Sequence, residues 1–298
     1  MNYEEFKKEL VNALSKKFGD GSVSIANSLF MGKETEIIKI KIGNRESMCS
    51  VKPLFNLHKR DKQPLSYYIS MLESALKEVE NPPLLQPSRI LYKLVNQKEE
   101  AEFLSRAPYL PFYDMAITFL YQLDENMQSR RYLAITYDIM EENNLTVSKL
   151  ADLAHENTQR MYPCQTNFFP AQVFENMYFD LSASTGKFVA FALAAFEERS
   201  HHRVPMYVVS SYDYRYGCSA LAYPEYLDML SQKFGASLIV VPDSDKSFFV
   251  MPFDESVNKN EIKDALSKAD FSGCKRISEH IFFYDKDKQT LTILGEDE

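Results

Sequence analysis

The residues best suited to chemistry gather in one short segment, Tyr-Asp-Tyr-Arg-Tyr-Gly-Cys at 212–218, between a predicted strand and a predicted helix. Turns from a strand into a helix often carry ligand contacts. The tyrosine rings offer stacking faces and hydroxyl groups, and an arginine fork suits a carboxylate or a phosphate. We therefore name as candidate ligand-binding residues Tyr214, Arg215, Tyr216 and Cys218. The simpler interpretation of the same segment is a turn with aromatic packing.

Cys218 is also a potential nucleophile. A thiol becomes reactive when its pKa is lowered, for example at a helix N-terminus, and it then needs a nearby histidine as a base. The spacing links none of the histidines to it, and the segment does not match a G-x-S-x-G nucleophile elbow. The candidates for the base are His155, His201, His202 and His280. We therefore expect a buried structural thiol and predict no catalytic residue.

Metal and phosphate sites are not indicated. His201 and His202 are adjacent, so on a helix they point about 100° apart rather than to one face. Asp243-Ser244-Asp245 resembles part of a calcium loop, but the glycine and the later oxygen ligands of such a loop are missing. The chain has only 9 glycines, which leaves little material for glycine-rich phosphate loops. We predict no metal and no cofactor.

The charge argues against a nucleic-acid partner. The formal net charge is -8, and binding to nucleic acid draws most of its affinity from lysine and arginine on phosphates. Residues 145–158 resemble the first helix of a helix-turn-helix, but no basic recognition helix follows. The expected partner is therefore a protein or a small molecule, and not a nucleic acid.

Composition also bears on the compartment. The four cysteines stand far apart without a C-x-x-C pair, which is typical of reduced thiols. The opening residues are acidic, unlike a signal peptide. The longest apolar run, 188–196, is far shorter than the roughly 20 residues that span a bilayer. We expect a cytoplasmic protein without membrane association, in which this run forms a core helix or, alternatively, a self-association surface.

The first 84 residues form one predicted unit. Apolar residues recur every three or four positions over 3–18 and again over 65–79, so both stretches are predicted helices. Ile38, Ile40 and Ile42 alternate with lysines, as in a half-buried strand. We also expect a weak strand from Val23 and a short third strand near 50–55. The prolines at 82 and 83 end the unit, which has the order α-β-β-α.

Residues 85–298 form a larger predicted domain. Strands and helices follow one another in a β-α-β-β-α order that occurs twice, from Ile90 and from Met206. An irregular helical insertion interrupts this order at about 161–204. Because the helices fall between antiparallel hairpins, the fold class is α+β, with mainly antiparallel sheets and packed helices.

Eight stretches of the chain carry a further resemblance: 1–10, 90–96, 107–116, 155–158, 206–210, 216–220, 223–224 and 237–242. Through them the chain resembles an uncharacterised bacterial family, a domain of unknown function common in gut anaerobes. The resemblance implies no catalytic residue, and two places depart from the family: the turn at 243–247 and the segment 161–204.

Two functions remain open. The first is a non-enzymatic binding or regulatory protein, because no acid–base, nucleophile or phosphate constellation is recognisable. The alternative is a small-molecule-binding protein or an enzyme that uses the 212–218 loop.

Overall fold

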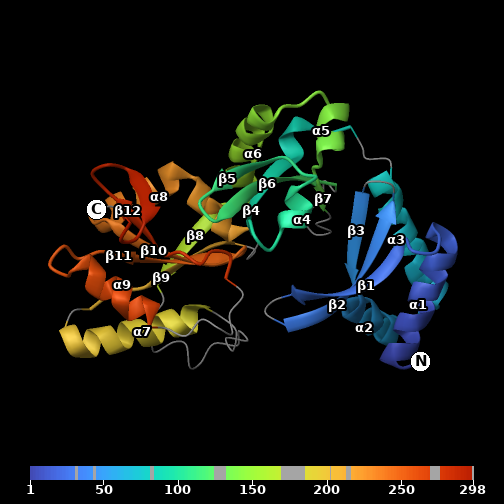
Figure 1. The fold of residues 1–298 in the computed structure, drawn as a ribbon, viewed down its shortest axis with the longest axis horizontal. Helices are drawn as coiled ribbons and strands as arrows, with labels where there is room; N and C mark the ends of the chain where they lie inside the picture. The colour runs from blue at the N-terminus through green and yellow to red at the C-terminus, as the bar shows by residue number, and fades with distance from the viewer. Residues whose placement is uncertain are drawn as a thin grey trace. The chain divides into compact units, whose positions relative to one another are not determined.

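The computed structural model divides the chain into two compact units, Met1–Leu84 and Leu85–Glu298 (Figure 1). We call them unit 1 and unit 2 and describe each by itself. The structure describes residues 1–30, 33–42, 45–80, 84–123, 132–168, 185–201, 203–212, 216–268 and 276–296.

Unit 1 is a three-stranded antiparallel sheet with helices packed on it. Its elements are α1 (Tyr3–Phe18), β1 (Val23–Phe30), β2 (Lys33–Ile42), β3 (Arg45–Ser50), α2 (Val51–Asp61) and α3 (Leu65–Glu80). The sheet order is β1-β2-β3. Phe6, Leu10 and Leu14 on α1 pack with Ile38 and Ile40 of β2 in its core.

The sequence signals the start of α1 more clearly than the start of α2. The Asn2 side chain accepts from the Glu5 N–H while the Glu5 carboxylate accepts from the Asn2 N–H, so a capping box starts α1. The expected strand near 50–55 is wrong, because β3 ends at Ser50 and α2 begins at Val51. Val51, Leu54 and Phe55 are buried at helical spacing, which the strand interpretation overlooked.

Unit 2 begins with a four-stranded antiparallel sheet. The strands are β4 (Ile90–Asn96), β5 (Tyr109–Phe112), β6 (Met115–Gln122) and β7 (Tyr132–Ala134), and β6 pairs with each of the other three. The helical segments are η1 (Pro87–Arg89), α4 (Ala101–Leu104), α5 (Tyr137–Glu142) and α6 (Val147–Met161).

Side chains of α6 protect the edge of β4 that β6 does not use. The Asn157 amide donates to the carbonyl oxygens of Ile90 (2.9 Å) and Pro87 (2.7 Å). Thr158 Oγ1 accepts the Tyr92 N–H at 3.0 Å. An exposed strand edge invites pairing with other chains, and these two buried polar side chains satisfy it instead.

The second sheet of unit 2 has six antiparallel strands in the order β13-β12-β10-β11-β9-β8. The strands are β8 (Cys164–Phe168), β9 (Tyr207–Ser211), β10 (Leu238–Ser244), β11 (Ser247–Pro252), β12 (Phe282–Asp285) and β13 (Thr290–Ile293). The helical segments are α7 (Thr185–Ser200), η4 (Gly217–Ala222), α8 (Pro224–Phe234) and α9 (Lys259–Ser267).

Helices lie on both faces of this sheet: α7 and α9 below it and α8 above it in Figure 1. Successive strand residues point to opposite faces, so Ile239 and Val241 of β10 pack with α7 and α9, while their neighbours point to the other face of the sheet. Val189 and Phe196 of α7 are buried in this core, whereas Phe191 is 65% exposed. In the described part of 161–204, β8 is thus a strand of the sheet, and α7 belongs to the helical layer that covers one of its faces.

The α+β class with antiparallel sheets is confirmed. The repeated order is not confirmed as a whole. From β9 the chain runs β9-α8-β10-β11-α9, but from β4 it runs β4-α4-β5-β6 and then adds β7 before α5. Both stretches pair their first strand with their third and their third with their second.

The segment before β12 ties the two sheets of unit 2 together. Asp114, in the β5–β6 turn, accepts from the Ser278 hydroxyl (2.6 Å) and from the Glu279 N–H (2.8 Å). The Asn96 amide at the end of β4 donates to the Ile277 carbonyl oxygen at 3.2 Å. These bonds join segments far apart in the chain, so the two sheets share one folded unit.

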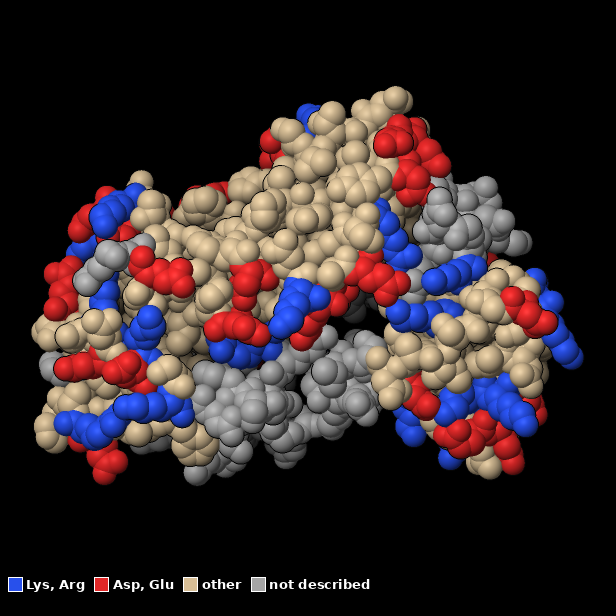
Figure 2. All heavy atoms as spheres, viewed as in Figure 1, with Lys and Arg blue, Asp and Glu red and all other residues tan. Residues whose placement is uncertain are grey.

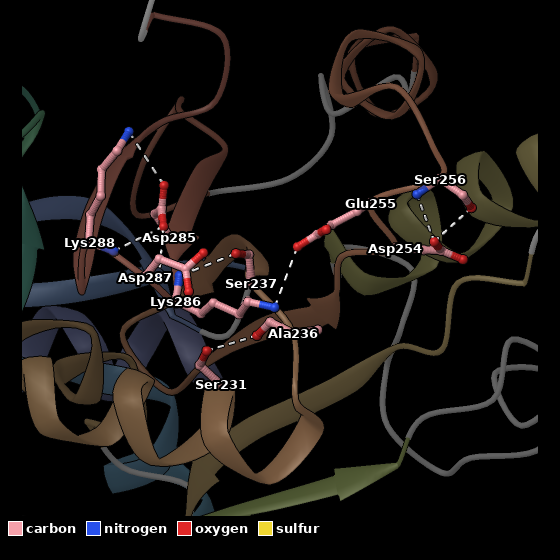
Figure 3. A network of polar contacts seen from close by, with 10 residues as sticks. All are labelled: Ser231, Ala236, Ser237, Asp254, Glu255, Ser256, Asp285, Lys286, Asp287 and Lys288. Carbon is pink, nitrogen blue, oxygen red and sulfur yellow. Dashed lines mark hydrogen bonds and ion pairs between the residues drawn. The ribbon is translucent and has the colours of Figure 1, made fainter.

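A polar network closes one end of the six-stranded sheet (Figure 3). The Lys286 N–H donates to Ser237 Oγ (3.2 Å), and the Lys286 ammonium lies 3.4 Å from the Glu255 carboxylate. In the same turn, the backbone N–H groups of Asp287 and Lys288 donate to the Asp285 carboxylate, which also lies 3.5 Å from the Lys288 ammonium. Asp285 thus binds its own turn, as in a structural turn.

Candidate ligand-binding surface of unit 2

The structure describes only part of the loop that the sequence singles out. Tyr214 and Arg215 lie outside the described residues, so their roles stay predictions. Tyr212 ends the preceding segment and is 67% exposed. Tyr216 and Cys218 are described, and they have different surroundings.

Cys218 is fully buried inside unit 2. Its N–H donates to the Asp245 carbonyl oxygen at 3.3 Å, and its side chain is 0% exposed. Burial first, and then the carboxylates of Asp243 and Asp245, raise the pKa of the Cys218 thiol well above its ordinary value. The neutral thiol is a poor nucleophile, which agrees with the interpretation as a structural thiol.

Gly217 explains why this segment lies where it does. A Cβ at Gly217 would lie 2.2 Å from the Lys246 carbonyl oxygen and 2.6 Å from the Ser211 nitrogen. Only a residue without a side chain lets η4 approach the ends of β9 and β10 this closely. From there η4 contacts β4, β9, β10 and β11, so it lies at the junction of the two sheets.

Tyr216 turns its ring into the four-stranded-sheet side of this junction. Its backbone φ of 49° lies in the left-handed region, and Tyr216 is the N-cap residue from which η4 starts. The ring packs edge-on against Tyr132 and Tyr162, at 5.6 Å from each ring centroid. The hydroxyls of Tyr132 and Tyr162 are hydrogen-bonded to one another. Tyr216 therefore contributes to aromatic packing, which agrees with the simpler interpretation of the loop as a packed turn.

Tyr223, at the other end of η4, forms the floor of a surface site. Its ring packs against Tyr92 (centroids 5.4 Å apart) and against the imidazole of His155 (5.5 Å). Burial raises the pKa of both tyrosine hydroxyls, so both stay protonated. The two rings are almost completely buried, whereas the His155 side chain that packs on Tyr223 is 39% exposed.

Glu225 lies above this floor, in the first turn of α8, where Pro224 starts the helix. Glu225 Oε1 lies 2.8 Å from His155 Nε2 and accepts from the Gln159 amide at 2.6 Å. Partial burial alone would raise the pKa of Glu225, but its own backbone N–H and then Gln159 and His155 lower it below the ordinary value. The carboxylate is thus held ionised while its side chain is 54% exposed.

Two tyrosines extend the surface along α8 and β8. The Tyr226 hydroxyl lies 3.0 Å from Thr166 Oγ1, and burial raises the pKa of Tyr226 to about 12. Tyr212 follows β9; its N–H donates to the Pro163 carbonyl oxygen (3.4 Å), just before β8, and its side chain is exposed. We call the five side chains of this region the α6–α8 surface: His155, Gln159, Tyr212, Glu225 and Tyr226.

Sequence reasoning missed Gln159, Glu225 and Tyr226, and it considered His155 only as a base for a thiol. The available signals were local: the end of an amphipathic helix at 159 and an acidic residue directly after the proline that starts the next helix. Neither signal shows that α6 and α8 meet, because 66 residues separate Gln159 from Glu225.

Other kinds of site find no support in the part of the chain that the structure describes. It contains no group of three or more His, Cys, Asp or Glu placed to hold a metal ion. Within the same residues, no helix is both long enough and apolar enough to cross a membrane.

Comparison with known proteins gives one match. A model of a family described as a family of unknown function (DUF5688) matches residues 85–286. The match covers more than half of the chain and includes all of the α6–α8 surface. No curated protein and no solved structure matches.

Proposed function

The chain belongs to the DUF5688 family, whose function is unknown, and we propose a function from the α6–α8 surface. We propose that the protein is a non-enzymatic binding protein that holds a cationic segment of a protein partner. The expected resemblance to an uncharacterised family is confirmed over 85–286, while the opening helix lies outside the match.

One observation carries the proposal: the half-exposed, ionised Glu225 carboxylate above a tyrosine floor. His155 and Gln159 contact one oxygen, Oε1, and the side chain stays 54% exposed, so the carboxylate is accessible to a ligand. A lysine or arginine of a partner would meet this carboxylate in a charge-assisted hydrogen bond.

The charge of unit 2 favours such a ligand. Residues 85–298 carry 21 Lys and Arg against 31 Asp and Glu, so the domain is strongly acidic. A domain field of this sign attracts cationic segments and speeds their encounter. Binding also agrees with the lack of a reactive thiol at Cys218, whose neutral form burial favours.

Fluorescence anisotropy with a labelled arginine-rich peptide tests the proposal on the full chain. Glu225→Gln should weaken binding about tenfold, because a hydrogen bond to a charged group contributes on the order of 1.5 kcal/mol or more. Glu198→Gln, on the exposed side of α7, changes the net charge equally and should leave binding unchanged. Equal effects of the two substitutions, or no binding by the native chain, would refute the proposal.

Two further expectations from the sequence concern the cellular location and self-association. Cys49 and Cys218 form no disulfide, which supports our proposal of a cytoplasmic location. The exposed Phe191 on α7 supports self-association through that helix as a further proposal. Light scattering over a concentration range tests it, and a monomer at all concentrations would remove it.

A further inference from the structure

Unit 1, which lies outside the family match, has a small excess of basic residues. Residues 1–84 hold 13 Lys and Arg against 11 Asp and Glu, so this unit has the opposite sign to unit 2. Lys and Arg side chains recur over the described face of unit 1 in Figure 2, where they alternate with acidic ones. Several of these basic groups are paired with acids.

Three basic side chains of unit 1 form ion pairs with carboxylates. Lys7 lies 2.6 Å from Glu36, Lys17 lies 2.5 Å from Glu73, and Arg60 lies 2.7 Å from Asp61. Such pairs neutralise each other and offer little attraction to a partner.

Lys52 and Lys59 on α2 differ from these groups. Neither forms an ion pair with a carboxylate among the residues that the structure describes. Both ammonium groups instead lie over aromatic rings: Lys52 is 5.8 Å and Lys59 is 5.0 Å from the Phe55 ring centroid. Lys52 is also 4.8 Å from the Tyr3 ring centroid.

Helix geometry puts these lysines on one exposed stripe. Lys52, Asn56 and Lys59 are four and three positions apart, which is the spacing of one helix face, and all three are exposed. Two positions seven residues apart on a helix are separated by about 10 Å. Cation–π attraction to the buried Phe55 holds the ammonium groups near the helix surface, so less side-chain freedom is lost when an anion binds.

We propose that the Lys52–Asn56–Lys59 stripe of α2 binds an acidic segment of a protein partner. Alternate carboxylates of an extended acidic peptide lie about 7 Å apart and can reach both lysines, and the Asn56 amide between them can bond the peptide backbone. A long polyanion such as a nucleic acid is disfavoured, since a net excess of two basic groups on unit 1 stands against the acidic rest of the chain.

Anisotropy of a labelled hexaglutamate peptide with the full chain tests this inference. The double variant Lys52→Gln/Lys59→Gln should weaken binding about tenfold, and added salt should weaken the native complex. Lys52→Arg/Lys59→Arg should retain binding because it keeps both charges. Lys16→Gln/Lys17→Gln, at the end of α1, makes the same change in net charge elsewhere and should leave binding unchanged.

Circular dichroism melts must show that each variant is folded. A folded Lys52→Gln/Lys59→Gln protein that binds like the native chain, or a native chain that does not bind the peptide, overturns the proposal. Tighter, lysine-dependent binding of an oligonucleotide of equal charge would overturn the assignment to an acidic peptide.

Discussion

The carbonyl oxygen of Lys246 occupies the space that a side chain on Gly217 would need, because a Cβ there would lie only 2.2 Å away. Neither group could rotate away, because the carbonyl oxygen belongs to the backbone and a Cβ is attached to it. Lys246 lies in the turn between β10 and β11, and Gly217 begins η4. The contact fixes η4 against the six-stranded sheet. It thereby also positions Tyr223 and the start of α8, which carry the floor and the carboxylate of the α6–α8 surface.

Gly217→Ala should therefore destabilise the protein by about 2 kcal/mol or more, through overpacking against backbone atoms. Urea unfolding of unit 2 measures it. Gly235→Ala is the matched control: Gly235 has a φ of 66° but nothing lies within 4 Å of its Cβ position. It should cost only the left-handed backbone penalty of about 1 kcal/mol. Equal costs for both variants would contradict the close approach.

The protection of the β4 edge predicts an effect of Thr158. Thr158→Val keeps the shape of the side chain but removes the oxygen that accepts the Tyr92 N–H, at a site that is 1% exposed. A buried donor without a partner costs about 1 to 3 kcal/mol. Urea unfolding should show this loss, and Glu156→Ala, exposed on the same helix, should not. Native-like stability of Thr158→Val would mean that another group satisfies the Tyr92 N–H.

The buried thiol of Cys218 should resist alkylation. Its pKa is raised well above the ordinary value by burial, so the reactive thiolate does not form near pH 8 in the folded protein. Mass spectrometry after iodoacetamide treatment should find Cys218 unmodified in buffer and modified in urea. Rapid modification of the native protein would show that the thiol is accessible and would reopen a catalytic role.

Cys49 predicts a loss of stability at alkaline pH. Burial raises its pKa from an ordinary 9.0 to about 11 in the folded state. Between these values the unfolded chain releases a proton that the folded chain keeps, so unfolding becomes more favourable as pH rises. Melting temperatures should fall from pH 9 to pH 11, and Cys49→Ala should reduce that fall. An equal fall in both proteins would assign it to other groups.

Ligand binding at the α6–α8 surface should survive mild acid. Because the pKa of Glu225 is lowered in the folded protein, its carboxylate stays ionised above the ordinary value of 4.5 and is protonated only below it. Affinity for the arginine-rich peptide should therefore hold down to about pH 4.5 and fall below it. Peptide anisotropy at several pH values measures this, with Glu225→Gln as the variant that lacks the step. Loss of affinity already near pH 6 would contradict this role of Glu225.

Regular elements with strong periodicity were predictable. Helices α1 and α8 begin at a capping box and at a proline, and both signals are local in the sequence. The strand–helix boundary at Val51 was not predictable in the same way, because a short apolar run fits either period. The place of 188–196 in a core likewise depends on the sheet that α7 covers.

The candidate site shows the same division. The sequence by itself determined the residue types, the acidic charge of residues 85–298 and the elements that carry the functional groups. It also directed attention to the aromatic loop at 212–218, whose described part contributes packing through Tyr216 and Cys218. Only the tertiary structure decided that α6 meets α8 and brings His155 and Gln159 to Glu225. Sequence spacing sets which residues share a helix face, whereas contacts across 66 residues follow from how sheets and helices pack.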